Sequence, residues 1–322
     1  MRVAIVGAGI AGPTLAYWLW RYGHEPTLIE KAPRPRTGGY AVDFWGGGYA
    51  VAERMGLIDE LHSVGYAVQD VRLVDRKSRK AGGFSVDSFR RAVDGRFVTV
   101  ARGDLAAIIY RCIHRHVETL FGETVSAIAQ DDSGVQVTFE RGWRRMFDLV
   151  IGADGIHSPV RRLVFGPEAA FEAGLGYRVA AFEVQGYQPR DELVYVAYNT
   201  PGRMVGRFAM REDRTLFLFI FAADRMSGPE PQNLAEVRNT LRDVFGDAGW
   251  ECAEILRELD CIADVYFDRV SQIAMDRWSQ GRVALIGDAA AAVSLLAGEG
   301  AGLAMVQAYI LAGEINRARA DY

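Results

Sequence analysis

A short strand that runs into a glycine-rich turn and then a helix constrains the N-terminal fold more than any other sequence feature. Arg2–Val6 (RVAIV) predicts a buried strand, GAGIAG follows at once, and Ile10–Tyr22 predicts a helix that ends at Gly23. Glu25–Glu30 (EPTLIE) predicts the next strand. This order predicts a βαβ unit, in which a crossover helix joins two parallel strands. The sequence therefore favours an α/β fold with a parallel sheet.

The spacing of the glycines indicates what this turn could bind. Gly7 allows the tight turn, Gly9 lets a diphosphate approach the backbone, and Gly12 lets the helix pack closely on the strand. Ile10 and Ala11 begin the helix, whose N–H groups and positive dipole end would face the phosphates. We therefore predict a site for the ADP part of a dinucleotide.

An acidic residue at the end of the second strand narrows the choice of dinucleotide. Glu30 follows the glycine turn by about 20 residues, where a carboxylate accepts hydrogen bonds from ribose hydroxyls. A carboxylate would repel a 2′-phosphate, so the site should hold FAD or NAD and not NADP. Lys31 lies next to it and is included among the expected cofactor contacts.

A membrane segment is the alternative interpretation of the same region. Residues 3–20 carry no charge, and Arg2 precedes them, as in a leader or a spanning helix. The three glycines and Pro13 interrupt the stretch in its middle, however, and the strand–turn–helix pattern explains it better. We therefore expect no membrane insertion.

Composition excludes other classes of function. The 322 residues carry a formal net charge of −4 at pH 7, which gives no basic surplus for binding nucleic acid. Cys112, Cys252 and Cys261 form no Cys-x-x-Cys pair, and His114 and His116 would face apart on a helix, so no metal site is expected. Reduced thiols fit a cytoplasmic protein. We expect the protein to be a monomer or a homodimer.

Two later segments repeat the transition from strand to glycine to helix. Residues 148–162 (DLVIGADGIHSPVRR) pass through Asp154 and Gly155. Residues 282–305 (RVALIGDAAAAVSLLAGEGAGLAM) pass through Gly287 and Asp288. An Asp beside such a helix start could bind a sugar-type hydroxyl without crowding. The glycine turn alone cannot separate FAD from NAD. The two later segments favour FAD, if all three segments contact one cofactor.

The remaining chain predicts a different kind of structure. Ala32–Gly48 is rich in Pro, Gly and Arg and predicts a long loop. Four strands separated by turn residues, then two helices, are expected at Val179–Val184, Leu193–Tyr198, Met204–Met210, Leu216–Phe221, Leu234–Phe245 and Glu251–Glu258. A sheet made of these strands could present one face to a cavity. Its aromatic residues are expected to be core by default: Tyr195, Tyr198, Phe208, Phe217 and Phe219.

These three ordered motifs resemble the class A flavoprotein monooxygenases, the family of para-hydroxybenzoate hydroxylase and the tetracycline-modifying hydroxylases. The resemblance implies a Rossmann-type FAD-binding domain with a parallel sheet and an inserted β-sheet substrate domain. We expect the FAD-binding domain to comprise residues 1–70, 97–176 and 272–322, and the substrate domain residues 71–96 and 177–271.

Roles follow from the resemblance by motif. Glu30 would bind the adenosine ribose, Asp288 the ribityl chain, and Asp154 with Gly155 would lie near the diphosphate and the NAD(P)H route. The backbone of residues 298–302 would lie beside the flavin ring. From the last two motifs, the expected cofactor contacts are Asp154, Gly155, Gly287, Asp288, Gly298, Gly300 and Ala301.

Two arginines extend the expected cofactor site. Arg102 stands at a predicted helix start, where a cation opposes the helix dipole and so suggests a purpose beyond structure. Arg36 lies in the predicted loop and precedes a glycine pair that ends at Gly39. Arg36 and Gly39 are weaker candidates for cofactor contact than Arg102. Asp43 and His157 are expected to serve local structure.

The resemblance also implies a reaction. NADPH or NADH, as a transient co-substrate, would reduce FAD, and oxygen would form a C4a-hydroperoxide that attacks an aromatic or polyketide-like small molecule. The cofactor performs this chemistry, so no catalytic acid or base is nominated. Two alternatives stay open. One is a flavin-dependent reductase or dehydrogenase of a hydrophobic substrate, and the other is a non-redox FAD-binding cyclase or binding protein.

The sequence departs from the family pattern near its end. Ala291 stands where relatives often have His, and Ser294–Leu296 where they often have Pro. Glu299 adds a carboxylate, which could disfavour an anionic reduced flavin nearby. Relatives usually continue beyond the position of Tyr322, so we expect either a fragment or a chain without a covering C-terminal element.

Overall fold

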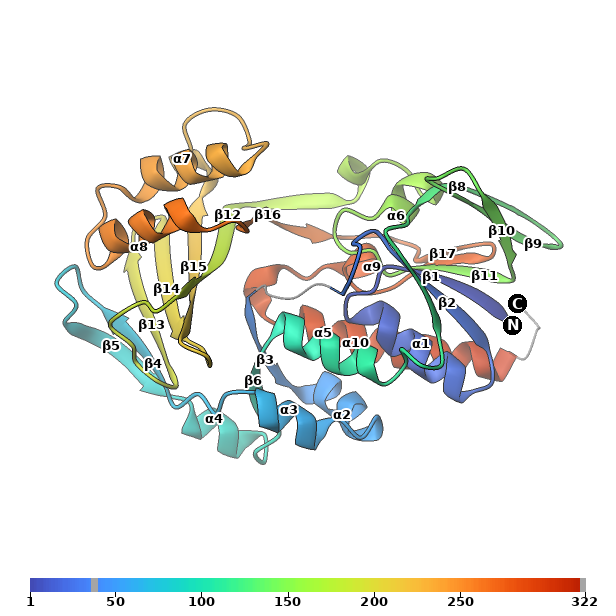
Figure 1. Cartoon of the computed structure of the whole chain (residues 1–322), viewed down its shortest axis with the longest axis horizontal. Helices are drawn as coiled ribbons and strands as arrows, with labels where there is room; N and C mark the ends of the chain where they lie inside the picture. Colours follow the sequence, from blue (N-terminus) through green and yellow to red (C-terminus); the bar gives the residue numbers. More distant parts are fainter. Residues whose placement is uncertain (36–39, 319–322) are drawn as a thin grey trace.

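A computed structural model describes residues 1–35 and 40–318. In Figure 1 a sheet with covering helices lies at one end of the molecule, a second sheet surrounded by helices lies at the other, and a small sheet of short strands lies between them. Among the described residues, no helix has both the length and the apolar composition needed to cross a bilayer.

The first sheet confirms the predicted βαβ unit. Strand β1 (Arg2–Val6) pairs in parallel with β2 (Glu25–Glu30), and α1 (Ala11–Arg21) connects them. The full strand order is β17-β18-β11-β1-β2-β7. The other four strands are β7 (Glu118–Phe121), β11 (Leu149–Gly152), β17 (Ser279–Gln280) and β18 (Val283–Leu285). Strands β1, β11 and β18 are neighbours, so the three glycine motifs follow adjacent parallel strands and end at one edge.

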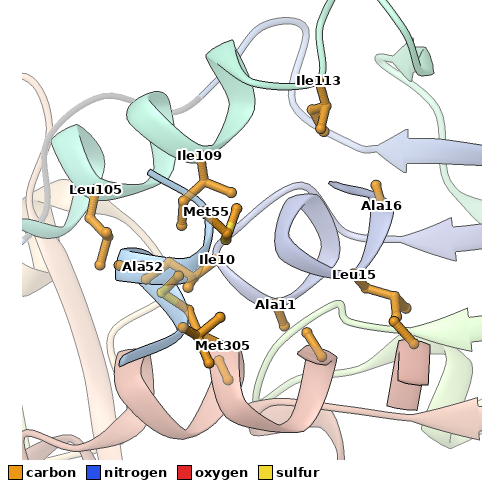
Figure 2. Close-up of a cluster of buried hydrophobic side chains, with 14 of the residues drawn as sticks. Ile10, Ala11, Leu15, Ala16, Ala52, Met55, Leu105, Ile109, Ile113 and Met305 are labelled. Carbon is orange, nitrogen blue, oxygen red and sulfur yellow. The ribbon is translucent and has the colours of Figure 1, made fainter. Parts of the chain in front are cut away.

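One helical layer covers a face of this sheet. It contains α1, α2 (Gly46–Arg54), α5 (Arg102–Arg111) and α10 (Gly300–Ala318). Figure 2 shows the apolar side chains that these helices bury between them, among them Leu15, Met55 and Met305. Burying such side chains removes apolar surface from water and fixes the helix starts relative to the strand ends.

The prediction of one long loop over residues 32–48 was wrong. Strand β3 (Ala41–Trp45) lies there and pairs antiparallel with β6 (Phe97–Ala101), a strand that the sequence did not reveal. The glycines that suggested a loop begin α2 instead. A Cβ on Gly48 would lie 2.4 Å from the Cα of Gly302, so this glycine lets α2 press against α10. Close helix packing therefore accounts for Gly48, and residues 36–39 of the expected loop lie outside the described residues.

The second sheet has seven strands in the order β16-β12-β15-β14-β13-β4-β5. Helices α7 (Leu234–Phe245) and α8 (Cys252–Glu258) cover one of its faces (Figure 1). Phe217, Phe219 and Phe221 alternate along β15 and are buried against these helices. The strands are β4 (Asp70–Val74), β5 (Lys80–Ser85), β12 (Glu172–Gln185), β13 (Val194–Thr200), β14 (Arg203–Ala209), β15 (Arg214–Ala222) and β16 (Tyr266–Ile273).

Of the five aromatic residues expected in the core, four are buried and Tyr195 is partly exposed. The remaining elements are a small antiparallel sheet and short helices. The sheet contains β8 (Val125–Asp131), β9 (Gly134–Phe139) and β10 (Arg144–Phe147). The helices are α3 (Ile58–Val64), α4 (Asp87–Ala92), α6 (Pro159–Val164), α9 (Asp288–Ala291) and the 3-10 turns Glu168–Ala170, Ala223–Arg225, Leu259–Cys261 and Leu295–Ala297.

Candidate functional site

The turn after β1 depends on two glycines that leave no room for a side chain. Gly7 has φ of +107°, and a Cβ there would lie 2.3 Å from the carbonyl oxygen of Ala153. A Cβ on Gly12 would lie 1.9 Å from the carbonyl oxygen of Gly7. The turn is therefore packed between α1 and the loop that follows β11. Within the described residues, no side chain caps the start of α1, whose first N–H groups stay available to an anion.

Glu30 lies at the end of β2 beside this turn. Its carboxylate accepts hydrogen bonds from the backbone N–H of Ala8, at 2.8 Å, and of Ala32, at 2.9 Å. Only 7% of the residue is exposed, yet it lines a cavity at the edge of the sheet together with Lys31. Glu30 therefore lines the cavity and also stabilises the glycine turn. The sequence did not predict this second role.

Two cavities adjoin at the strand ends and share part of their walls. The first is lined by the glycine turn, the end of β2 and one side of α5, and the second by the starts of α9 and α10. Gly9, Arg102, Ala153 and Gly155 line both. The first also contains Gly7, Glu30, Lys31 and Asp154, and the second contains Ile10, Ala11, Gly287, Asp288, Gly298, Gly300 and Ala301.

Arg102 lies where the two cavities meet. It is the first residue of α5, as predicted, and its backbone N–H donates to the carbonyl oxygen of Tyr40 at 3.0 Å. A Cβ built on Gly9 would have the Arg102 Nη2 atom, 3.6 Å away, as its nearest neighbour outside the adjacent chain. The guanidinium therefore borders the bare backbone of the glycine turn, where a cation can meet a phosphate.

Asp288 lines the second cavity as the first residue of α9. Burial raises the pKa of its carboxyl, and the positive charge of Arg102 opposes that rise. Gly287, just before it, has φ of +62° and donates its N–H to the Gln307 side chain of α10 at 2.6 Å. This bond fixes the direction in which the strand enters α9.

Asp154 has a local structural part that its motif did not predict. One carboxylate oxygen accepts from the Ser158 hydroxyl at 2.5 Å, and the other from the backbone N–H of Val160 at 2.9 Å. Burial raises the pKa of the carboxyl, and both hydrogen bonds act in the opposite direction. Asp154 therefore holds the start of α6 while lining the first cavity.

The structure brings together nearly all of the site residues expected from the sequence. Gly12 lies outside both linings because it packs beneath the turn, and Arg36 and Gly39 lie outside the described residues. Residues of β16 also line the second cavity and carried no sequence signal, because pairing with the distant strand β12 places them there. These unpredicted residues are Tyr266, Asp268, Arg269 and Ser271.

Comparison with known proteins identifies the group to which this arrangement belongs. The family model of the FAD binding domain matches residues 1–318. A flavin-dependent monooxygenase of Legionella longbeachae is 33% identical over 100% of this chain and 82% of its own length. The chain belongs to this FAD-binding monooxygenase family. An uncharacterised protein of Mycobacterium tuberculosis is 38% identical over 99% of this chain and 86% of its own length.

A solved structure of the family supports the same assignment. The tetracycline destructase Tet(51) superposes with a TM-score of 0.87 and 33% sequence identity, covering 100% of this chain and 83% of the other. The α/β fold with a parallel sheet and additional antiparallel sheets is thus the fold of FAD-binding monooxygenases. The chain is accordingly a FAD-dependent oxidoreductase, as the motifs predicted.

The cavity walls fit the cofactor of this monooxygenase family. Uncapped N–H groups at α1 and the cation of Arg102 suit a diphosphate, and carboxylates of Glu30 and Asp288 lie toward opposite ends, where sugar-type hydroxyls would lie. Ser271 is one of the residues that line the second cavity, and its buried hydroxyl has no hydrogen-bond partner among the described residues. Such an unpaired polar atom is costly unless a ligand or water meets it.

His157, expected to serve local structure, joins the loop that follows Asp154 and Gly155 to β16. Its ring nitrogens contact Glu168 at 3.1 Å and Asp268 at 3.3 Å. The hydrogen bond to Asp268 raises the pKa of His157 to about 9, burial opposes the rise, and Glu168 adds to it. The imidazolium is therefore the form that the folded protein holds at neutral pH.

This raised pKa predicts a pH dependence of stability. The contribution of His157 should be complete below pH ~6.5, the pKa of an unfolded histidine, and should decline as the pH rises through about 9. Thermal unfolding of the wild type and of His157→Gln, followed from pH 6 to pH 10, tests this. We expect the difference in Tm to narrow as the pH rises. A difference that stays constant would contradict the assignment.

Proposed function

We propose that this monooxygenase hydroxylates an aromatic or polyketide-like small molecule, with NADH or NADPH as the electron donor. The observation that carries the proposal is the composition of the second cavity. It contains Asp288 and Gly298 from the cofactor side, and Tyr266 and Asp268 from the edge of the seven-stranded sheet. The sheet therefore borders the place where the redox-active end of a cofactor would lie.

The sheet supplies an apolar face on the side opposite α7 and α8. Residues that alternate with the buried phenylalanines point there, and Ala197, Gly206 and Leu218 are adjacent in register and partly exposed. Apolar surface with a few polar groups at its margin is typical of small-molecule sites. We propose that residues 71–96 and 177–271 form the substrate domain.

FAD, when bound, supplies the redox chemistry, accepting electrons and activating oxygen. The chain's own residues position it. We expect Arg102 and the start of α1 to hold the diphosphate, and Asp288 to fix a hydroxyl of the linker. Tyr40 and Tyr266, with ring centroids 5.9 Å apart, stand at the wall of the second cavity and would restrict the entry of water.

Substrate-dependent turnover tests this proposal. The FAD-loaded protein is given NADH or NADPH and a panel of phenols, naphthols and tetracycline, the last chosen because a structurally similar enzyme is a tetracycline destructase. We expect at least one compound to stimulate NAD(P)H oxidation and to gain one oxygen atom from labelled oxygen gas. Peroxide as the sole product with every compound would contradict hydroxylation. Turnover of a double bond without oxygen would favour a reductase.

A further inference from the structure

Asp43 was expected to serve local structure, but its hydrogen-bond partners, Thr99 and Tyr195, lie far from it in the sequence. It lies in the middle of β3, whose neighbours Val42 and Phe44 are buried in the helical core. Because side chains alternate along a strand, Asp43 points to the opposite face. There β3 and β6 meet the seven-stranded sheet, and Asp43 is exposed at that meeting point.

Two hydroxyl groups hold one oxygen of this carboxylate. The buried Thr99, directly opposite on β6, donates from Oγ1 to Asp43 Oδ1 at 2.5 Å. The Tyr195 hydroxyl donates to the same Oδ1 atom at 3.4 Å, from the far sheet. Although Asp43 keeps solvent-accessible surface, desolvation by the protein packed around its carboxyl raises the pKa of that group, and both hydroxyls oppose the rise. Asp43 Oδ2 takes part in no hydrogen bond with any described residue and remains available as an acceptor.

The apolar face of the seven-stranded sheet begins next to this oxygen. Tyr195 is the second residue of β13, and Ala197, two residues on, lies opposite Gly206. Gly206 lies opposite Leu218, and all three of these residues are partly exposed. Small side chains in the middle of a sheet leave space for a flat group to lie on the strands. The contact between the Tyr195 hydroxyl and Asp43 links the carboxylate to this face of the sheet.

Strand β3 also reaches the second cavity, which Val42 lines from the face opposite Asp43. Trp45 lies two residues beyond Asp43 and therefore on the same side of the strand. Burial raises the pKa of the Glu299 carboxyl, and the Trp45 side chain opposes that rise. Glu299 lies between Gly298 and Gly300, which line the second cavity. A ligand on the sheet beside Asp43 would thus lie next to the loop expected to border the flavin ring.

We propose that Asp43 Oδ2 accepts a hydrogen bond from a phenolic or enolic hydroxyl of the substrate. Thr99 and Tyr195 orient the carboxylate by binding its other oxygen. A hydroxyl that donates to a carboxylate enriches its ring in electrons, and electrophilic oxygen attacks such carbons most readily. Asp43 therefore selects hydroxylated flat molecules over their ethers. This inference rests on the proposed function, because it concerns the substrate of that reaction.

The test measures binding without turnover. β-Naphthol and its methyl ether, β-methoxynaphthalene, are titrated into FAD-loaded protein without NAD(P)H, and the visible flavin spectrum reports Kd. Because hydrogen bonds to charged groups are strong, the wild type should bind the naphthol roughly tenfold or more tightly than the ether. Asp43→Asn should remove most of this preference, and Tyr195→Phe part of it. Asp59→Asn, at an exposed site in α3, should keep it.

The outcomes separate this inference from the proposed function. If the wild type binds the two probes equally, or binds neither, the role of Asp43 is overturned. The wild-type measurement alone decides this outcome. An Asp43→Asn protein that retains FAD and the full preference also overturns it. If the preference is present and Asp43-dependent but no compound is ever hydroxylated, the binding role stands and the proposed function fails.

Discussion

Replacing Gly12 with alanine should destabilise the protein strongly and abolish its retention of FAD. The new Cβ would lie 1.9 Å from the Gly7 carbonyl oxygen, which belongs to backbone and cannot move aside cheaply. Overpacking of this kind costs about 3 kcal/mol or more, which corresponds to a fall in Tm of roughly 5–10 °C. Thermal unfolding and the flavin absorbance of the purified variant measure the two effects.

Gly9→Ala is the matched control, because it adds the same methyl group three residues earlier. Its Cβ would meet nothing closer than the Arg102 side chain at 3.6 Å, so the fold should keep its Tm. Gly9 lines both cavities, however, and the methyl group would occupy the expected diphosphate position. We expect a stable protein with weakened FAD binding. If the Tm of Gly12→Ala is no lower than that of Gly9→Ala, the claim that Gly12 serves packing and Gly9 serves FAD binding is wrong.

Arg102→Gln should weaken FAD binding by roughly 10- to 100-fold, because charge-assisted hydrogen bonds to phosphate are among the strongest in proteins. The same change should leave the FAD-free protein equally stable or slightly more stable. Arg102 begins α5, where a positive charge opposes the helix dipole at a cost of about 0.3–1 kcal/mol. Isothermal titration with FAD and unfolding of the FAD-free protein give the two quantities.

Arg96→Gln provides the control for this second prediction. Arg96 pairs with Glu53 near the protein surface, away from both cavities, so its loss should leave FAD affinity unchanged. An Arg102→Gln protein that binds FAD as tightly as the wild type would contradict the placement of the diphosphate. A large loss of stability without FAD would indicate that Arg102 serves the fold instead.

Local patterns predicted the cofactor side of this protein well. Gly7, Gly12 and Glu30 act within about 25 residues of one another, so their spacing alone predicts the turn. Strand β3 was missed because its stabilising partner, β6, begins at Phe97, more than fifty residues away. A five-residue strand beside three glycines carries little local signal.

The side of the protein that we propose to bind substrate depends on register between distant strands. Asp43 meets Tyr195 only because β3 packs against a sheet that starts much later in the chain. No spacing in the sequence expresses that contact, and a lone Asp in a strand is usually a solvated residue. Tyr266 and Ser271 line the second cavity for the same reason, since β16 is placed by its antiparallel pairing with β12.

The central claim is that the two adjoining cavities together hold one FAD molecule. A calorimetric titration of the FAD-free protein with FAD tests this claim most directly. The account predicts one equivalent bound per chain, with ADP competing for the half beside Glu30 and excess NAD⁺ failing to displace the flavin. Absence of FAD binding, or two independent equivalents per chain, would contradict it.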